Sequence, residues 1–334
     1  MNILFCTFSK LIFFISICLT ILSCSQAQKL NEEQEEYISK TVEFYNNRNY
    51  DSAIYYSDKV LDFNPKNDIA WRIKGVGLYF LGKEEEAEKA LSNAININPN
   101  NAESHKYRAT IYHLNGEHRK AISDYDFYLK NEPNDELALA GKAKSYLRLK
   151  EYRKAIETYD YLLSLKIPPF SKVLNLSGRA LVYMELKQYE KAQESIEEAL
   201  EIGVESYIPL STQSEILLQK GDYQQSLIVA KEALKLTKLY QDEELRKELA
   251  VYSKGHIGYV KHKLGNTEEG LGEVLASLEE MPTNSYVYKH LALISFDLGK
   301  KEEGCQYIEK GLELGFTKMF GTEMEELKQE KCTN

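Results

Sequence analysis

Small residues recur along this chain at a fixed interval of 34 residues. They stand at Ala53, Ala87, Ala121 and Ala155 and, after short insertions near residues 168–170 and 238–250, at Ala192, Ser226, Gly270 and Gly304. A second small residue precedes each of these by twelve positions, at Thr41, Gly75, Ala109, Ala143, Ala180, Ser214, Gly258 and Ala292. A period of this length indicates stacked structural units that pack on their neighbours, without one central core.

Each period is predicted to be a helix, a turn and a second helix. Glycines lie between the two small positions, where the end of a helix needs a residue that accepts a positive φ angle, at Gly82, Gly116, Gly221, Gly265 and Gly299. Prolines that stop the second helix follow at Pro65, Pro99, Pro133 and Pro282. A small side chain is required where two antiparallel helices cross closely, and this explains both series.

The second unit resembles the tetratricopeptide repeat. Its matching residues are Trp71, Gly75, Leu78, Gly82, Ala87, Leu91, Ala94 and Pro99. The resemblance implies an all-α fold, a right-handed superhelical solenoid of antiparallel helix pairs. Eight repeats are expected at residues 34–67, 68–101, 102–135, 136–169, 173–206, 207–240, 251–284 and 285–318, followed by a capping helix and tail at 319–334. Repeat seven is rich in glycine, which indicates either a soft region or unusually close helix packing.

The first residues of the chain resemble an export signal. A single lysine, Lys10, precedes the apolar run from Leu11 to Leu22, which is short for a membrane-spanning helix. The sequence Ile-Leu-Ser-Cys at residues 21–24 resembles the lipobox of bacterial lipoproteins. We therefore expect residues 1–23 to be removed, Cys24 to be acylated, and residues 24–33 to tether the repeats to the membrane of a bacterial cell envelope. The alternative is cleavage near Ala27, which releases a soluble secreted or periplasmic protein.

Motifs for catalysis and cofactor binding are missing from the sequence. None of the six histidines forms a metal-binding spacing, and there is no nucleophile motif or phosphate-binding loop. The formal net charge of -9 argues against a surface adapted to nucleic acid. The sequence therefore predicts a protein that is not an enzyme and that uses no cofactor or metal.

The resemblance also implies a ligand-binding face. In tetratricopeptide repeats the first helix of each unit lines an inner groove, and five of its positions face the ligand. In repeats two to four these positions and their neighbours supply the predicted peptide-binding residues Arg72, Tyr79, Lys106, His113, Lys144 and Arg148, with Glu103 the only acid in the same positions. This face predicts a scaffold at the cell envelope that holds an extended or acidic segment of a protein partner. The carboxylate clamp known for chaperone tails is not reproduced.

Aromatic residues dominate the same positions farther along the chain. A second surface is predicted at Tyr252, Tyr259, Tyr286 and Phe296. Because aromatic rings stack on sugars, this surface supports an alternative function, the binding of glycans or peptidoglycan fragments.

Two cysteines lie beyond the signal and the lipid site. If the last helix folds back antiparallel on the second helix of repeat eight, Cys332 comes near Cys305, and an exported protein can bridge them. The alternative is two free thiols.

The lipid anchor gives a direct prediction. We expect the protein to incorporate a fatty-acid probe during metabolic labelling and the Cys24→Ser variant to incorporate none, because Cys24 supplies the thiol that is acylated. In-gel detection of the probe measures this, and labelling of Cys24→Ser at the level of the unchanged protein would exclude this site.

Overall fold

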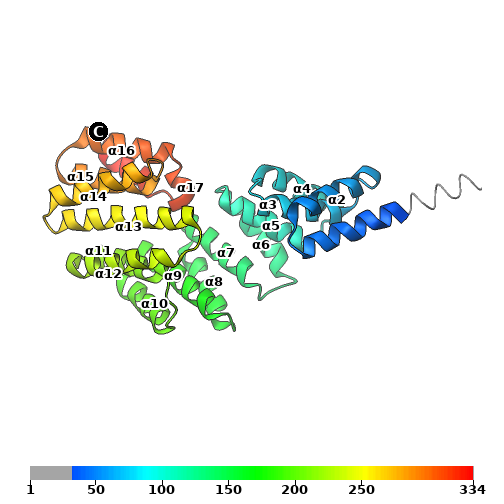
Figure 1. The fold of residues 1–334 in the computed structure, drawn as a ribbon. Helices are drawn as coiled ribbons and strands as arrows, with labels where there is room; N and C mark the ends of the chain where they lie inside the picture. The colour runs from blue at the N-terminus through cyan, green and yellow to red at the C-terminus, as the bar shows by residue number, and fades with distance from the viewer. Residues whose placement is uncertain (1–31, 334) are drawn as a thin grey trace, which may run out of the picture. The chain divides into compact units, whose positions relative to one another are not determined.

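The computed structural model describes residues 32–333. The predicted signal segment, 1–23, and Cys24 lie outside the described residues. Within them the chain is all-α, as predicted, and it divides into two compact units at residues 111 and 112. Figure 1 shows the helices in chain order. The two units are described separately.

Unit 1 comprises the described residues up to Ile111. It contains an unlabelled helix at residues 32–46, α2 (Tyr50–Phe63), α3 (Asp68–Phe80), α4 (Glu84–Ile97) and most of α5 (Ala102–Leu114). Helix α3 packs against both α2 and α4. A Cβ atom at Gly75 would lie 2.7 Å from Cγ of Leu91, so the glycine permits the close crossing of α3 and α4.

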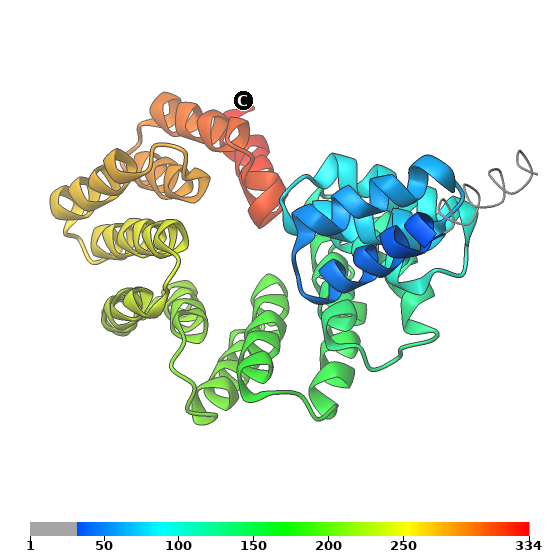
Figure 2. The same cartoon turned by 45° about the vertical axis from the view of Figure 1, so that its right-hand side comes forward.

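Unit 2 begins at Tyr112 and continues as helix pairs. Its helices are α6 (His118–Leu129), α7 (Glu136–Arg148), α8 (Tyr152–Ser164), α9 (Pro169–Glu185), α10 (Tyr189–Glu201), α11 (Tyr207–Gln219), α12 (Tyr223–Leu236), a short 3-10 turn (Thr237–Leu239), α13 (Glu243–Lys263), α14 (Thr267–Glu280), α15 (Ser285–Asp297) and α16 (Lys301–Glu313). The two helices of each pair pack together, and α9 also contacts α7 and α11. The pairs follow one another from green to red in Figure 2.

The turns inside the pairs have the left-handed backbone that the glycine pattern predicts. Gly82 has φ 74°. At the corresponding turns of the fourth and fifth pairs the chain has lysines, and Lys150 and Lys187 adopt φ 58° and 56°. A side chain in this conformation costs about 1 kcal/mol relative to glycine, so these two turns carry local strain.

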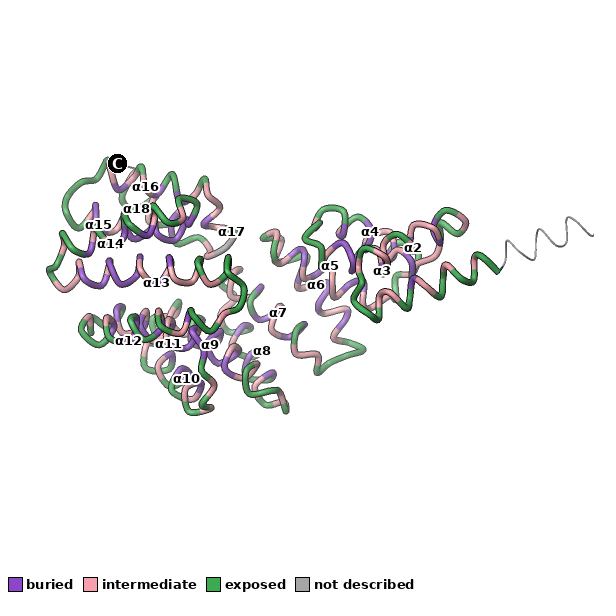
Figure 3. The backbone as a smooth tube through the Cα atoms, viewed as in Figure 1, coloured by how far each residue is buried: buried purple, intermediate pink, exposed green. Residues whose placement is uncertain are grey.

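The second insertion lengthens a helix. Residues 243–250 form the first two turns of α13, which therefore spans 21 residues. Asp242 caps this extension, because its carboxylate accepts a hydrogen bond from the Leu245 N–H at 2.8 Å. The buried residues of α13 recur along the helix in Figure 3.

Where helices α13 and α14 cross, they lie so close together that only glycine fits at the crossing point. A Cβ atom at Gly258 would lie 2.5 Å from the carbonyl oxygen of Gly270. The carbonyl oxygen of Gly258 would lie 2.3 Å from a Cβ atom at Gly270. Gly272, on the same helix as Gly270, has open space around it. These contacts favour close packing as the reason for two of the glycines, while a soft region here stays a prediction.

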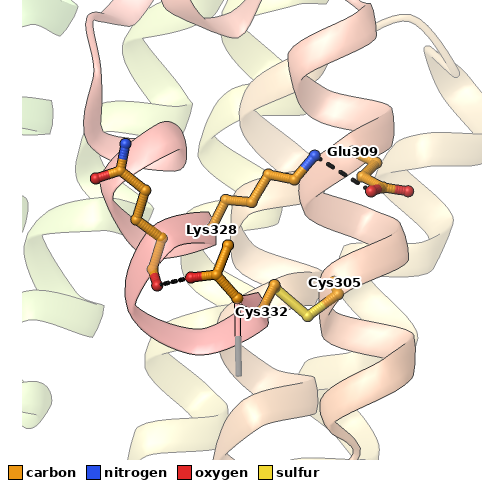
Figure 4. Close-up of a disulfide and its surroundings, with 6 residues drawn as sticks. Cys305, Glu309, Lys328 and Cys332 are labelled. Atoms are coloured by element: carbon orange, nitrogen blue, oxygen red, sulfur yellow. Dashed lines mark hydrogen bonds and ion pairs between the residues drawn. A yellow bond between two sulfur atoms is a disulfide. The ribbon is translucent and has the colours of Figure 1, made fainter.

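The chain ends in two short helices, α17 (Phe316–Phe320) and α18 (Glu323–Cys332). Helix α18 packs on α16, and Cys305 and Cys332 form a disulfide with a Cα–Cα distance of 5.8 Å. Lys328 adds an ion pair with Glu309 at 3.2 Å, as Figure 4 shows. Of the two alternatives for the cysteines, the structure contains the bridge.

The Gly258 contact predicts opposite effects for two similar substitutions. Gly258→Ala should lower the free energy of unfolding by about 1 to 3 kcal/mol, because the added methyl group meets backbone that must shift. Gly272→Ala should raise it by about 1 kcal/mol, because it only removes the helix penalty of glycine. Urea denaturation followed by circular dichroism measures both, and equal effects would contradict the packing argument.

Candidate functional site

In unit 1 the predicted peptide-binding residue Arg72 already has a partner. Its guanidinium forms an ion pair with the carboxylate of Glu103, on the next repeat. It also lies over the ring of Tyr45 at 5.6 Å from the centroid, and the Tyr45 hydroxyl is 3.4 Å from Glu103. The charge of Arg72 is therefore balanced within the unit.

Aromatic rings surround this pair. Phe80 stacks on Tyr50 with a centroid distance of 4.6 Å and keeps half of its surface exposed. Tyr79 lies 5.8 Å from Tyr107, and the ammonium group of Lys106 lies 5.9 Å from the centroid of the Tyr107 ring. This face of unit 1 is therefore aromatic as well as basic.

The cations of α7 lie in a different environment. Lys144 and Arg148 lie one turn apart on the helix. Desolvation by the surrounding protein lowers the pKa of Lys144, and Arg148 lowers it further. Desolvation also lowers the pKa of Arg148, although Glu185 and Tyr159 oppose this. Within the part of the chain that the structure describes, Lys144 forms no hydrogen bond or ion pair.

Two histidines lie beside these cations. The rings of His113 and His118 are 5.3 Å apart, and a ring nitrogen of His113 is 2.9 Å from the hydroxyl of Ser145. Burial lowers the pKa of His113 to about 4, and His118, Lys144 and Arg148 contribute to the shift. His113 is therefore neutral at pH 7 and adds no charge to the site.

These four residues, His113, His118, Lys144 and Arg148, form what we call the α7 cationic cluster. The charge of Arg148 lowers the pKa of Lys144 and of both histidines, because positive charges close together disfavour one another. A bound anion would relieve this repulsion and accept hydrogen bonds from Lys144 and Arg148. The cluster therefore has the chemistry of an anion-binding surface.

An acidic counterpart, which the sequence analysis missed, lies farther along unit 2. Burial would raise the pKa of Glu215, on α11, but Lys289 and His256 lower it below its ordinary value. Lys289 in turn forms an ion pair with Glu323 at 2.9 Å. Glu215 occupies the ninth position of its helix, one of the ligand-facing positions, so extending the analysis to repeat six would have found it.

Glu215 also belongs to an arrangement that resembles a catalytic triad. Nε2 of His256 lies 2.9 Å from the hydroxyl of Ser214, and Nδ1 lies 3.3 Å from a carboxylate oxygen of Glu215. However, Ser214 is fully buried where α11 crosses α12, and its hydroxyl donates to the carbonyl oxygen of Ser226 at 2.9 Å. No substrate reaches this hydroxyl, so the arrangement is a structural polar network.

Of the predicted aromatic surface, Tyr286 is buried, and Tyr252, Tyr259 and Phe296 are partly exposed. Tyr286 stacks near Tyr252, with centroids 4.2 Å apart, and is covered by Phe316 and Phe320, so only 6% of its surface is exposed. Phe296 packs against Gly304 at the crossing of α15 and α16. Tyr259 lies against the rings of His262 and His290. Tyr286 and Phe296 thus serve packing.

The described range contains neither a cluster of metal ligands nor a membrane-spanning helix. No group of three or more histidine, cysteine or acidic side chains there is arranged to hold a metal ion. In the same residues, no helix combines the length and apolar character needed to span a bilayer.

Two family profiles match the chain. One, described as the N-terminal tetratricopeptide-repeat region of psidin, matches residues 38–159, and one described as a tetratricopeptide repeat matches residues 176–202. No curated protein matches the sequence.

Solved structures resemble the chain at low sequence identity. The Cut9–Hcn1 hetero-tetramer of the APC/C aligns with 15% identity and a TM-score of 0.56, over 83% of this chain and 52% of that one. Yeast Tom70 aligns with 16% identity and a TM-score of 0.56, over 84% of this chain and 60% of its own. The chain thus spans between half and two thirds of these proteins. The likeness shows a shared fold of stacked helix pairs.

The buried histidines predict a loss of stability in mild acid. Besides His113, burial lowers the pKa of His118, His256 and His290. Because these bases bind protons less readily when folded, their contribution to stability is complete above about pH 6.5 and declines as the pH falls toward 4. The melting temperature should therefore drop between pH 7.5 and 5.0, and His113→Gln should reduce that drop. An equal drop in both proteins would contradict the role of His113.

Proposed function

We propose that this chain, a member of the tetratricopeptide-repeat family, binds an acidic segment of a partner protein through the α7 cationic cluster of unit 2. The repeats themselves support a protein–protein interaction scaffold in general, and this fold is typically non-catalytic. The ligand class and the cellular setting are our proposals.

The α7 cationic cluster carries the proposal. Lys144 has no carboxylate partner among the described residues, whereas Arg72 and Lys289 are paired with Glu103 and Glu323. The side chain of Lys144 is exposed, so a carboxylate of another molecule can reach its ammonium group and form a charge-assisted hydrogen bond. An acidic segment is the ligand that best matches this environment.

Unit 1 presents a separate surface that is aromatic and basic. Its exposed ring of Phe80, the neighbouring Tyr79 and the basic Lys106 suit a segment in which apolar and acidic side chains alternate. Arg72 would contribute through its stacking on Tyr45 more than through its charge, because Glu103 balances that charge.

We propose a bacterial cell envelope as the setting, with the protein anchored by lipid on Cys24. The apolar run from Leu11 to Leu22 and the Ser-Cys sequence that follows it support the proposal. The Cys305–Cys332 disulfide adds support, because such bonds persist mainly in exported proteins. Nine residues separate Cys24 from Gln34, so the tether reaches at most about 30 Å and the repeats would act near the membrane.

The alternative function, glycan binding, is less well supported. It requires an open aromatic platform, but Tyr286 is covered by Phe316 and Phe320. We therefore retain the acidic protein segment as the ligand.

Charge reversal tests this function. A fluorescein-labelled decapeptide of glutamate and glycine should bind the mature protein, and the double variant Lys144→Glu/Arg148→Glu should weaken binding at least tenfold, about 1.4 kcal/mol, because it removes two charge-assisted contacts. Fluorescence anisotropy measures the affinity.

The control makes the same charge change on the outer surface. Arg153→Glu/Lys154→Glu alters two exposed side chains of α8, whose only ion pairs are with Glu157 and Glu151 in the described structure. This variant should bind the peptide nearly as well as the unchanged protein. Equal weakening in both double variants would mean that only net charge matters, and the site would be wrong.

A further inference from the structure

The C-terminal segment of unit 2 contacts two distant parts of the same unit. We call residues Phe316–Cys332, which contain α17 and α18, the C-terminal strap. One side of the strap packs on α15 and α16, and the other side reaches the end of α7, the turn between α7 and α8, and the turn before α6.

The attachment to α15 and α16 is extensive. Phe316 and Met324 are fully buried there. The disulfide to Cys305 and the ion pair between Glu323 and the buried Lys289 fasten the same side. Separating the strap from these helices would expose apolar surface, leave a buried lysine unpaired and require reduction of the disulfide.

The attachment to the α7–α8 turn and to the turn before α6 is polar and exposed. Glu326 forms an ion pair with Lys150, and about half of each side chain remains accessible to water. Nζ of Lys318 donates to the side chain of Asn115 at 3.3 Å. The buried residues of α17 and α18 contribute nothing to this side, because they belong to the cluster on α15 and α16. Exposed ion pairs contribute little to stability and are screened by salt.

The weakly attached side lies beside the α7 cationic cluster. A Cβ atom at Gly321 would be 3.1 Å from Nη1 of Arg148, so the strap backbone passes close to the guanidinium group. Glu323 and Glu326 also lie close enough to Glu185 to raise the pKa of that carboxyl, after the larger effect of burial. The strap thus lies next to Arg148, one of the cations that the proposed function assigns to a partner.

We propose that the C-terminal strap is a reversible latch, fixed on α15 and α16 and released from the end of α7 and the two neighbouring turns when an acidic partner segment binds Arg148 and Lys144. The latch is the Lys150–Glu326 ion pair together with the Lys318–Asn115 hydrogen bond. The closed form partly covers Arg148 and therefore binds an acidic ligand less tightly than the open form. This proposal rests on the proposed function. It adds that a segment of the same chain, the strap, limits the access of the partner to Arg148.

The Lys150→Gln variant distinguishes the latch from electrostatic attraction alone, because the two predict opposite changes in the affinity for the peptide. Lys150→Gln removes a positive charge, so electrostatic attraction alone predicts weaker binding of the glutamate–glycine decapeptide. Opening of the latch predicts about threefold tighter binding, the range expected from losing an exposed ion pair. Lys187→Gln is the matched control, because Lys187 occupies the corresponding turn with nearly the same φ and has no ion pair in the described structure.

The other half of the latch has its own matched control. Glu326→Gln should also tighten binding about threefold. Glu309→Gln removes one negative charge and one exposed ion pair to the same helix, with Lys328, but leaves the latch intact, so its affinity should change little. All four variants are measured by fluorescence anisotropy with the disulfide oxidised.

Crosslinking of the unchanged protein reports closure directly. A carbodiimide should join Lys150 to Glu326 in 50 mM salt and give less than half that yield in 1 M salt, while the Lys328–Glu309 product, also from an exposed pair, keeps a larger share. Mass spectrometry quantifies both products.

Two outcomes would contradict the latch alone, and a third would contradict both the latch and the proposed function. If Lys150→Gln binds the peptide no more tightly than Lys187→Gln, or if the Lys150–Glu326 product never forms, the latch is wrong while the proposed function stands. If the peptide binds neither the unchanged protein nor any variant, both proposals fail.

Discussion

Close crossing of antiparallel helices is the constraint on which the whole array depends. Each pair must bring two backbones together at one point, and that point tolerates only a small side chain, as the contact between Gly258 and Gly270 shows most directly. The spacing of these points sets the repeat. Other features differ from one repeat to the next, including helix length, as the 21 residues of α13 show.

The period of the repeat therefore allowed most of the fold to be predicted from the sequence. It allowed less of the binding site to be predicted. Spacing identified the helix pairs and the positions of Arg72, Lys144 and Arg148, because those follow from the period. It did not reveal that Glu103 would reach Arg72 from the next repeat. The spacing also predicted Tyr286 on an open surface, but Phe316 covers it. Helix α17, which contains Phe316, has no counterpart in the repeats, so the pattern could not predict this contact.

Residues at equivalent positions thus have different roles according to their neighbours. Arg72 and Lys289 occupy the same position in their repeats, and each is balanced by a carboxylate of this chain. Lys144, at another ligand-facing position, has no such carboxylate within the described residues. Position in a repeat selects the face on which a side chain lies, whereas contacts between repeats decide whether its charge remains available to another molecule.

The disulfide at the end of the chain affects how the array can come apart. Stacked repeats usually unravel from their ends, where a pair has only one neighbour. Cys305 and Cys332 join the last helix to the final pair, so α18 cannot peel away from α16 while the bond is intact. The helix at residues 32–46 carries no such bond, so a protease acting on the native protein should shorten the described part of the chain more readily from its amino-terminal side.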